Sequence, residues 1–328
     1  MRKILLASTA LVAVAGISAA SAEISLSGGS DVSYTSVSDD ITDNATAGEN
    51  GTSMASDTDL KAAWSTTTDS GLVIAVNYDI DADSGDASIT GDWGTFTYDD
   101  GNEAMGVGGG DADSVSNMGI TGSTTPTYTG GEGIGGGMVA YSNTIGGIQF
   151  GIGMGDGGTT SEANETSYGV SYSASVNGAD VSVSYAAANT GAENTAAAST
   201  DLTASSMAVG VTVGKVSLAA AQNAQKTDRV DDNASATGAT DMKSTNMGVT
   251  YAVTDSLTLE AASVAATGTT AGSADYKYDE SAYGIAYTIA TGLTLTASYS
   301  DWTESGTGAS TGADVSGTGT TVKLAVSF

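Results

Sequence analysis

The sequence predicts an all-β fold: an antiparallel transmembrane β-barrel of about 16 strands with long outer loops. Three observations support this prediction. Apolar and polar residues alternate with a period of two from one end of the chain to the other. Short turn sequences alternate with long polar segments, and aromatic residues gather at the ends of the alternating segments. A barrel in lipid accounts for all three, because only a closed sheet pairs every strand amide within hydrocarbon.

The first segment, residues 1–22, has the features of an export signal. Arg2 and Lys3 form a charged start, an apolar stretch follows, and Ala20-Ser21-Ala22 is a small-residue cleavage site. We therefore expect two parts, a signal peptide over residues 1–22 and one barrel over residues 23–328. The whole chain carries a net charge of −29. Removal of Arg2 and Lys3 makes the mature chain more negative still, near −31.

The alternating segments predict the strands in chain order. In each one, apolar side chains at every second position face lipid, and Ser, Thr, Ala, Gly and Asp between them face water. The apolar sets begin with Ile24, Leu26, Val32 and Tyr34, continue through Leu72, Ile74, Val76 and Tyr78, then Ile148, Phe150, Ile152 and Met154, then Met207, Val209, Val211 and Val213, then Tyr283, Ile285, Tyr287 and Ile289, and end with Val322, Leu324, Val326 and Phe328.

The lengths of the connections predict which end of the barrel faces the periplasm and which faces outward. Tight turns are expected at sequences such as Thr68-Asp69-Ser70-Gly71, Gly91-Asp92-Trp93-Gly94 and Asn177-Gly178. Between them lie long polar loops, at about 36–56, 99–137, 156–165, 187–201, 223–243, 267–279 and 303–316. This asymmetry is typical of outer-membrane barrels, which have tight periplasmic turns and longer external loops. On this division Lys226, Arg229, Lys243 and Lys277 belong to outer loops.

The residues that the chain lacks narrow the possible chemistry. It has neither cysteine nor histidine, so thiolate chemistry, disulfides and the commonest general base are excluded. A nucleophile–histidine arrangement is impossible, and we do not expect an enzyme. The single proline, Pro126, suits a chain made mostly of paired strands, because proline cannot donate to a ladder.

At this level the chain resembles the Gram-negative trimeric general porins, most closely the alphaproteobacterial, Rhodobacter-type porins. The resemblance covers the whole mature chain. Its most specific parts are the opening Glu23-Ile24-Ser25-Leu26-Ser27-Gly28, the hairpin Thr68-Asp69-Ser70-Gly71-Leu72, the segment Ile89-Thr90-Gly91-Asp92-Trp93-Gly94-Thr95-Phe96, and the terminal strand that ends at Phe328. The resemblance implies a homotrimer, 16 strands per protomer, a third loop folded into the lumen, and Phe328 as the signal read by the barrel-assembly machinery.

The residues expected to line the pore follow from this resemblance and from strand parity, by which we mean that successive side chains of a strand point alternately to lipid and to the lumen. The third loop, 99–137, would bring Glu103, Asp111, Asp113 and Glu132 to the constriction. On the facing lumen wall, parity places Lys61 and Lys323, with the acids Asp31 and Asp59 beside them. Rings of carboxylates favour cations, so the acidic balance predicts cation selectivity.

Asp79, Asp81 and Asp83 resemble the start of a calcium-binding loop. However, Ser84 replaces the glycine at the sixth position and Thr90 replaces the glutamate at the twelfth. Calcium is therefore only a weak candidate ligand, and no other cofactor is expected. The alternative is an acidic second loop, which in trimeric porins contacts the neighbouring protomer.

The function expected is passive diffusion of small hydrophilic solutes and ions through the cell outer membrane. A substrate-specific channel would need an aromatic slide or a basic track, and the inward positions show neither. A secreted acidic adhesin or surface-layer protein is the alternative from another class. Expected partners are two further copies of the chain, outer-membrane lipid and lipopolysaccharide, the barrel-assembly machinery and the permeating solutes; nucleic acid is not expected.

Overall fold

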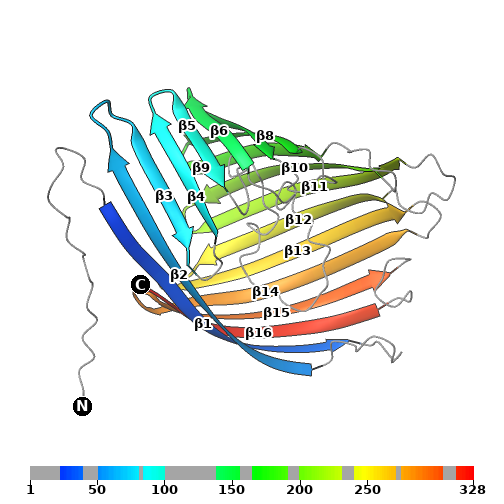
Figure 1. The fold of residues 1–328 in the computed structure, drawn as a ribbon. Helices are drawn as coiled ribbons and strands as arrows, with labels where there is room; N and C mark the ends of the chain where they lie inside the picture. The colour runs from blue at the N-terminus through cyan, green and yellow to red at the C-terminus, as the bar shows by residue number, and fades with distance from the viewer. Residues whose placement is uncertain are drawn as a thin grey trace, which may run out of the picture.

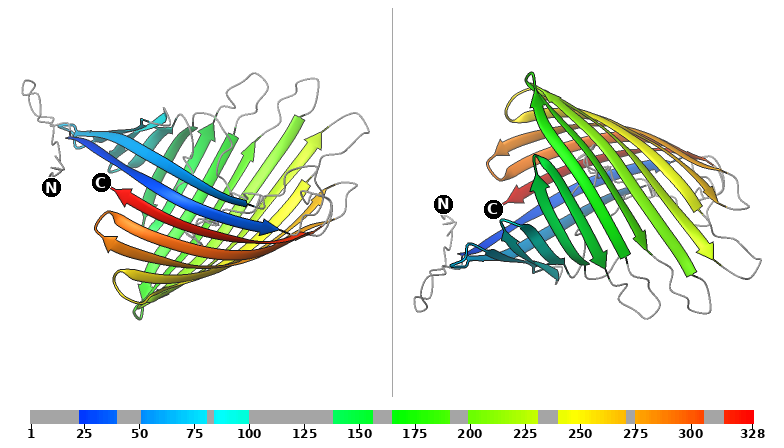
Figure 2. Two further views of the ribbon diagram at one scale, coloured as in Figure 1. Left: turned by 90° about the horizontal axis from the view of Figure 1, so that it is seen from below. Right: turned by 90° about the horizontal axis from the view of Figure 1, so that it is seen from above.

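A computed structural model shows a closed barrel of 16 antiparallel strands (Figures 1 and 2). Each strand pairs with its neighbours in chain order, and β1 closes the barrel against β16. The structure describes residues 23–39, 51–80, 84–99, 138–155, 165–190, 199–230, 240–270, 275–305 and 315–328. Within these ranges no helix is long and apolar enough to cross a membrane. The fold predicted from the sequence is confirmed.

The strands differ in length around the barrel. They are β1 Glu23–Asp39, β2 Gly51–Thr67, β3 Val73–Asp79, β4 Ser84–Gly91, β5 Gly94–Asp99, β6 Met138–Ile145, β7 Ile148–Gly155, β8 Glu165–Val176, β9 Ala179–Thr190, β10 Ser199–Val213, β11 Val216–Val230, β12 Thr240–Ala252, β13 Leu257–Thr270, β14 Tyr276–Ala290, β15 Leu293–Ser305 and β16 Val315–Ser327. The short turns lie at one end, on the left in Figure 1, so this is the periplasmic end.

Turn chemistry explains the tight connections. Asn177 (φ 53°) and Gly178 (φ 82°) both adopt the left-handed conformation that a two-residue hairpin turn requires. Gly292 (φ 73°) does the same between β14 and β15, where its carbonyl oxygen accepts from the Ser327 amide at 2.8 Å. These turns fix the register of the strands, and register decides which side chains face lipid.

The period-two alternation appears in the structure as an apolar outer surface. Leu26, Ile152 and Met207 are 62%, 57% and 56% exposed. In water such an exposed apolar surface would cause aggregation, whereas in a bilayer lipid covers it. Aromatic residues of this surface lie toward both strand ends, among them Tyr34, Tyr98, Tyr185 and Tyr299 at the loop end and Trp64, Tyr172, Tyr251, Tyr287 and Phe328 at the turn end.

The seam between the first and last strands is regular. Ser33 lies opposite Lys323, and Val32 lies opposite Leu324. The Gly28 amide donates to the Phe328 carbonyl at 3.1 Å, and the Phe328 amide donates to the Gly28 carbonyl at 2.9 Å. The terminal residue therefore takes part directly in closing the cylinder.

Several strands extend beyond their predicted ends. Lys226 and Arg229 lie in β11, Lys243 in β12 and Lys277 in β14, so their prediction as outer-loop residues is wrong. The reason is physical: backbone pairing continues above the hydrocarbon region, where water permits polar side chains on both faces. Hydrophobic alternation marks only the part of a strand that contacts lipid.

The strands of the barrel wall are shorter on one side than on the other. β3 to β7 have 6 to 8 residues each, whereas β1 and β2 have 17. β2 pairs with β3 only from Lys61 to Thr67, and the Ile80 amide donates to the Leu60 carbonyl at 2.8 Å. Beyond Leu60, the edge of β2 that faces away from β1 has no pairing strand among the described residues, and residues 51–58 are exposed on both faces.

Candidate functional site

A charged wall lines the lumen on β16, β1, β2, β3 and β4. Lys323 and Asp31 face inward, since Leu324 and Val32 beside them face lipid. Their charged groups form an ion pair, with the Lys323 Nζ 2.6 Å from the Asp31 Oδ2. The Asp31 side chain is only 19% exposed, so its carboxylate is held against the wall by this lysine.

The second lumen lysine is shared between two carboxylates. The Lys61 Nζ lies 3.3 Å from the Asp59 Oδ2 on its own strand and 3.6 Å from the Asp79 Oδ2 on β3. Lys61 and Asp79 are direct cross-strand partners, which explains the contact. Lys61, Asp59 and Asp79 therefore form a second charged cluster beside the Lys323–Asp31 pair.

Two further aspartates add negative charge to the same wall. Asp57 lies directly opposite Asp31, and its Oδ1 accepts from the Thr58 amide at 2.9 Å. Asp86 on β4 accepts from the Asn77 Nδ2 at 2.9 Å. Five carboxylates against two ammonium groups give this wall a formal charge of −3; its members are Asp31, Asp57, Asp59, Asp79, Asp86, Lys61 and Lys323.

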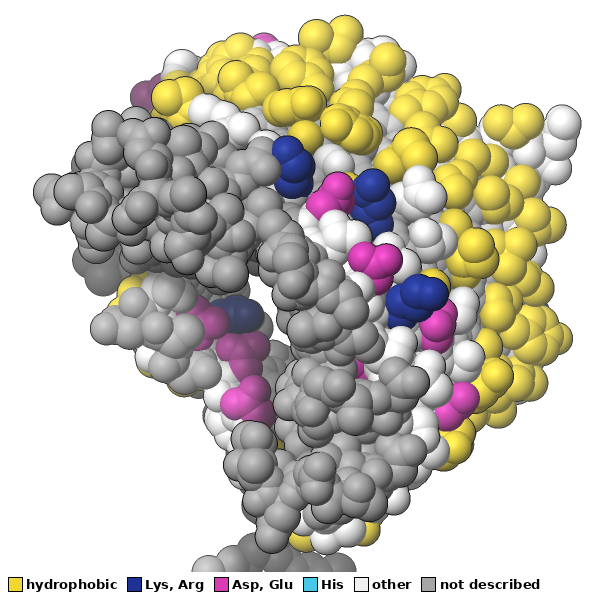
Figure 3. Space-filling view, turned by 90° about the vertical axis from the view of Figure 1, so that its right-hand side faces the viewer, with side chains coloured by type: hydrophobic (Ala, Val, Ile, Leu, Met, Phe, Trp, Pro, Cys, Tyr) yellow, Lys and Arg dark blue, Asp and Glu magenta, His cyan; other side chains and the backbone are white. Residues whose placement is uncertain are grey.

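The remaining lumen surface is lined mainly by small and polar residues. Strand parity places Glu260, Glu280 and Glu304 inward on β13, β14 and β15, each next to an outward position. In the view from the loop end, acidic side chains gather around a basic one within the hollow (Figure 3). Acidic side chains thus predominate among the described lumen charges.

Among the described residues, one aromatic pair faces inward, on β14 and β15. Tyr278 and Trp302 stack with ring centroids 6.5 Å apart, and the Tyr278 hydroxyl donates to the Glu280 Oε2 at 2.7 Å. Tyr278 is 1% exposed and Trp302 is 7% exposed. Because both rings are buried, they offer no stacking surface to a passing sugar.

The predicted constriction residues Glu103, Asp111, Asp113 and Glu132 lie outside the described residues, and so do Asp81 and Asp83. Asp79, the remaining candidate calcium ligand, contacts Lys61. Among the described residues no group of three or more acidic side chains is arranged to hold a metal ion. Both the constriction and calcium binding therefore stay predictions.

Sequence reasoning missed Asp57, Asp86, Tyr278 and Glu280 as lumen residues. Each lies on a strand that carries a residue whose direction the pattern does predict, and the number of positions between the two gives its own direction. Asp57 shares its face with Asp59, and Tyr278 alternates with the outward Tyr283. Extending the alternation of side-chain directions to the ends of the strands would have predicted that all four side chains face the lumen.

With this geometry established, comparison with known proteins identifies the family. The sequence model of the Gram-negative porin family matches residues 7–327. The chain belongs to the Gram-negative porins. It is therefore a channel protein of the outer membrane, and the resemblance drawn from its motifs is confirmed. A search of curated protein sequences found no match.

Solved structures share the porin barrel at low sequence identity. The trimer form of OmpT from Vibrio cholerae is 14% identical, with a TM-score of 0.61 over 94% of this chain and 99% of that one. The anion-selective porin of Comamonas acidovorans is 14% identical, with a TM-score of 0.62 over 94% and 100%. A mutant of the Rh. blastica porin is 15% identical, with a TM-score of 0.54 over 93% and 100%. These likenesses concern the fold, so ion preference must come from this porin's own lumen residues.

Proposed function

We propose that this porin is a cation-selective channel for the passive diffusion of small hydrophilic solutes and ions. The observation that supports it most directly is the charged lumen wall. Both of its described lysines are paired with carboxylates, while Asp57 and Asp86 add negative charge beside them. A wall of this kind attracts cations into the lumen and repels anions.

The arrangement of the ion pairs affects the field in the lumen as much as the number of charged groups does. Lys323 is 2.6 Å from one carboxylate, and Lys61 lies between two. At these distances the field of each ammonium group is largely cancelled for an ion several ångströms away. The unbalanced carboxylates then dominate the field in the lumen, because low-dielectric barrel walls focus it.

Reversal potentials test this proposal. The purified porin is inserted into a planar bilayer that separates two KCl solutions of different concentration. A potential whose sign shows K⁺ crossing faster than Cl⁻ supports the proposal, and a potential of the opposite sign overturns it. Because fixed charges are screened by salt, the preference should weaken in molar KCl.

We also propose that the porin assembles as a homotrimer. The support from this chain is the edge of β2 over residues 51–58, which has no pairing strand within the part of the chain that the structure describes. An unpaired strand edge is not tolerated in contact with lipid. A neighbouring protomer would shield it. OmpT, whose barrel has a similar fold, also has a trimer form.

Delivery of the chain is the last part of the proposal. We expect residues 1–22 to be removed on export and Phe328 to be recognised by the barrel-assembly machinery. Phe328 directly follows the periplasmic end of β16, and the residue is 72% exposed. The constriction role of Glu103, Asp111, Asp113 and Glu132 and the weak calcium site at Asp79, Asp81 and Asp83 remain proposals.

A further inference from the structure

Several buried polar side chains lie close together on the lumen wall formed by β11 to β15. They are Asn223, Asn246, Glu280 and Trp302, which are 3%, 5%, 8% and 7% exposed. One polar atom of each has no hydrogen-bond partner within the described part of the chain, namely the Asn223 Oδ1, the Asn246 Oδ1, the Glu280 Oε1 and the Trp302 Nε1. Such atoms are rare in folded proteins because each one costs free energy, so a group of them on one wall points to a bound solute.

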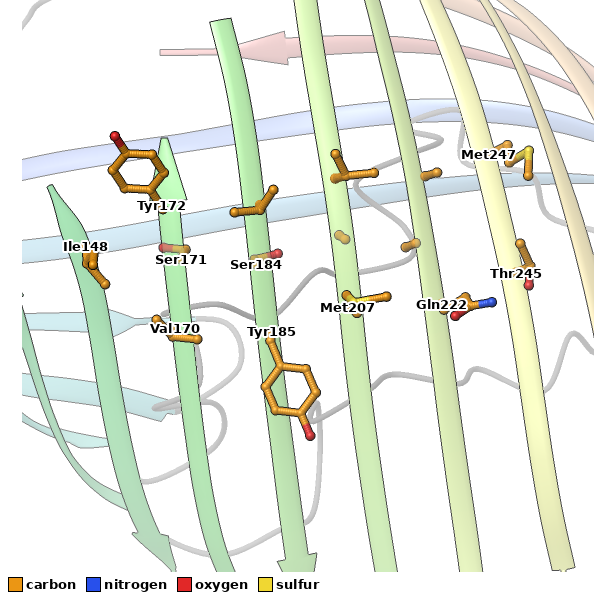
Figure 4. A pocket seen from close by; sticks show the side chains of 15 residues that line it. Ile148, Val170, Ser171, Tyr172, Ser184, Tyr185, Met207, Gln222, Thr245 and Met247 are labelled. Atoms are coloured by element: carbon orange, nitrogen blue, oxygen red, sulfur yellow. The ribbon is translucent and has the colours of Figure 1, made fainter. Parts of the chain in front are cut away.

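The direction of the two asparagines follows from the outer face of the same strands. Gln222 on β11 and Met247 on β12 line a groove on the outer surface of the barrel (Figure 4). Asn223 and Asn246 are their immediate neighbours in sequence, so they point to the opposite side of the sheet, into the lumen. They therefore share the lumen face with the inward Glu280 of β14.

The register of the strands brings these residues into neighbouring rows. Asn246 lies opposite Val264 on β13, Val264 lies opposite Glu280, and Glu280 lies opposite Trp302. Asn246 and Glu280 are therefore two strands apart, with about 10 Å between their backbones, since neighbouring strands are about 4.8 Å apart. Asn223 on β11 lies one row nearer the loop end. We call Asn223, Asn246 and Glu280 the acceptor row, because each presents an oxygen without a partner among the described residues.

The acceptor row carries negative charge without a basic neighbour in its own rows. The Glu280 Oε2 accepts from the Tyr278 hydroxyl at 2.7 Å, so its Oε1 is the oxygen left without a partner. Glu304 lies opposite Tyr278 and adds a second inward carboxylate. No basic residue stands among the inward partners of these residues on β10 to β13, which are Ser206, Ala208, Ala221, Ser244, Val264 and Ala266. A ligand that completes the row must therefore supply N–H donors and positive charge.

A guanidinium group meets both requirements. It is always charged, has five N–H donors in a planar fork and no acceptor, and is less strongly hydrated than an ammonium group. Its fork can donate to oxygens on two strands at once, whereas the three donors of an ammonium group surround a single point. We propose that the acceptor row binds a solute with a guanidinium group, of the kind that arginine carries, through the Glu280 Oε1 and the Asn246 Oδ1. This inference rests on the proposed function as a diffusion channel, which brings such solutes into the lumen.

Trp302 is the neighbour of Glu280 that moves when the solute binds. Because Glu280 is only 8% exposed, a solute reaches its carboxylate after a neighbouring side chain turns aside. The Trp302 ring lies against Gly317 on β16, where an added Cβ would be 2.6 Å from the indole Cε2. Its Nε1 has no partner among the described residues, so packing and not a hydrogen bond holds the ring there. Rotation away from Gly317 opens the carboxylate and places the ring face beside the bound cation, a contact that attracts.

Tryptophan fluorescence of the folded porin in detergent tests the proposal. L-Arginine is titrated in one series and L-citrulline, which has the same shape but a neutral ureido group, in another. We expect a saturable change of emission with arginine and none with citrulline, because Trp302 leaves its packed position. Trp302→Phe should abolish the change, since the other two tryptophans, Trp64 and Trp93, lie at the turn end.

Substitutions in the acceptor row should change arginine binding in opposite directions. Glu280→Gln keeps the size of the side chain and removes its charge, and it should weaken binding about tenfold, since hydrogen bonds to charged groups are the stronger ones. Asn246→Asp adds a carboxylate and should tighten binding severalfold, a gain that misfolding cannot produce. Asp279→Asn is the matched control, because it removes a charge one residue from Glu280 but on the outer face of β14, and binding should not change.

Conductance of the same protein in planar bilayers separates this inference from the proposed function. Open channels in which arginine binds no more tightly than citrulline would overturn the inference and leave the proposed function standing. Bilayers without ion current would overturn the proposed function itself. Equal weakening by Asp279→Asn and Glu280→Gln would also overturn the inference, because the effect would then come from net charge and not from the acceptor row.

Discussion

At the scale of single residues, a substitution of Asp57 tests most directly whether the lumen carboxylates set the ion preference. It faces the lumen opposite Asp31, which is itself neutralised by Lys323. We predict that Asp57→Asn lowers the K⁺ over Cl⁻ permeability ratio about twofold, because a charge about 8 Å from an ion in water interacts by about 0.5 kcal/mol. Reversal potentials in a KCl gradient measure the ratio.

The control for this prediction is Asp301→Asn, on the outer face of β15. It removes the same charge from the molecule but leaves the lumen unchanged, so the permeability ratio should not move. A shift of equal size in both variants would mean that net charge, and not the charged lumen wall, sets the preference.

Gly94 gives a residue-scale prediction about stability. Its φ of 118° is disfavoured for other residues, and a Cβ there would lie within hard contact of the Ser142 carbonyl oxygen and 3.1 Å from the Asn143 Cβ. We expect Gly94→Ala to cost about 1 to 3 kcal/mol more than Gly178→Ala, whose added Cβ meets open space. Urea midpoints followed by tryptophan fluorescence compare the two; equal midpoints would contradict the steric argument.

The sequence predicts which charged side chains of the charged lumen wall face the lumen, but it does not predict which of them form ion pairs. Parity alone placed Lys61 and Lys323 inward, because their neighbours are apolar. The ion pairs were not predictable, because they depend on the register that sets Lys61 opposite Asp79 and Ser33 opposite Lys323. Register comes from turn geometry and strand length, which the local sequence only partly determines.

At the scale of strands, the open edge of β2 makes a prediction about assembly. The Leu60 carbonyl points away from β1, so Thr52, Met54 and Ser56 present their amides and carbonyls at the same edge. Ser56→Pro removes one of these amides, and proline is tolerated on an edge strand. We expect the barrel to form normally while the trimer fraction, measured by mass photometry, falls severalfold.

Ala55→Pro is the matched control for this edge. Ala55 lies opposite Ser33, and its amide points toward β1. The substitution should therefore weaken the barrel itself, seen as loss of heat-modifiable migration in detergent gels. Should Ser56→Pro leave the trimer fraction at the wild-type value, the edge of β2 would not belong to the contact between protomers.

The strands also show where sequence patterns stop being informative. Alternation located strands such as β1, β10 and β16 within lipid, but it placed the start of β12 after Lys243 instead of at Thr240. Above the membrane both faces contact water, so nothing selects apolar residues at every second position. Lys226, Lys243 and Lys277 lie in this zone, which is why the sequence pattern predicts them as loop residues.

At the scale of the whole molecule, closure of the cylinder depends on the last residue. Both hydrogen bonds between Gly28 and Phe328 join main-chain atoms, while Phe328 as a whole residue is 72% exposed. We predict that Phe328→Ala refolds in detergent as the wild type does, because the substitution keeps those hydrogen bonds. In cells, however, its amount in the outer membrane should fall severalfold, since the assembly machinery no longer finds the aromatic residue.

Deletion of Phe328 separates its role in closing the barrel from its role in delivery to the outer membrane. It removes the ring together with both hydrogen bonds, so refolding in detergent should slow and the amount in cells should fall. If Phe328→Ala already refolds as poorly as the deletion, the ring acts in closure through its contact with the backbone at Gly28, where an added Cβ would lie 3.0 Å from the ring. If it is delivered to the outer membrane normally, the ring is no delivery signal, and closure of the cylinder is the function of the terminal residue.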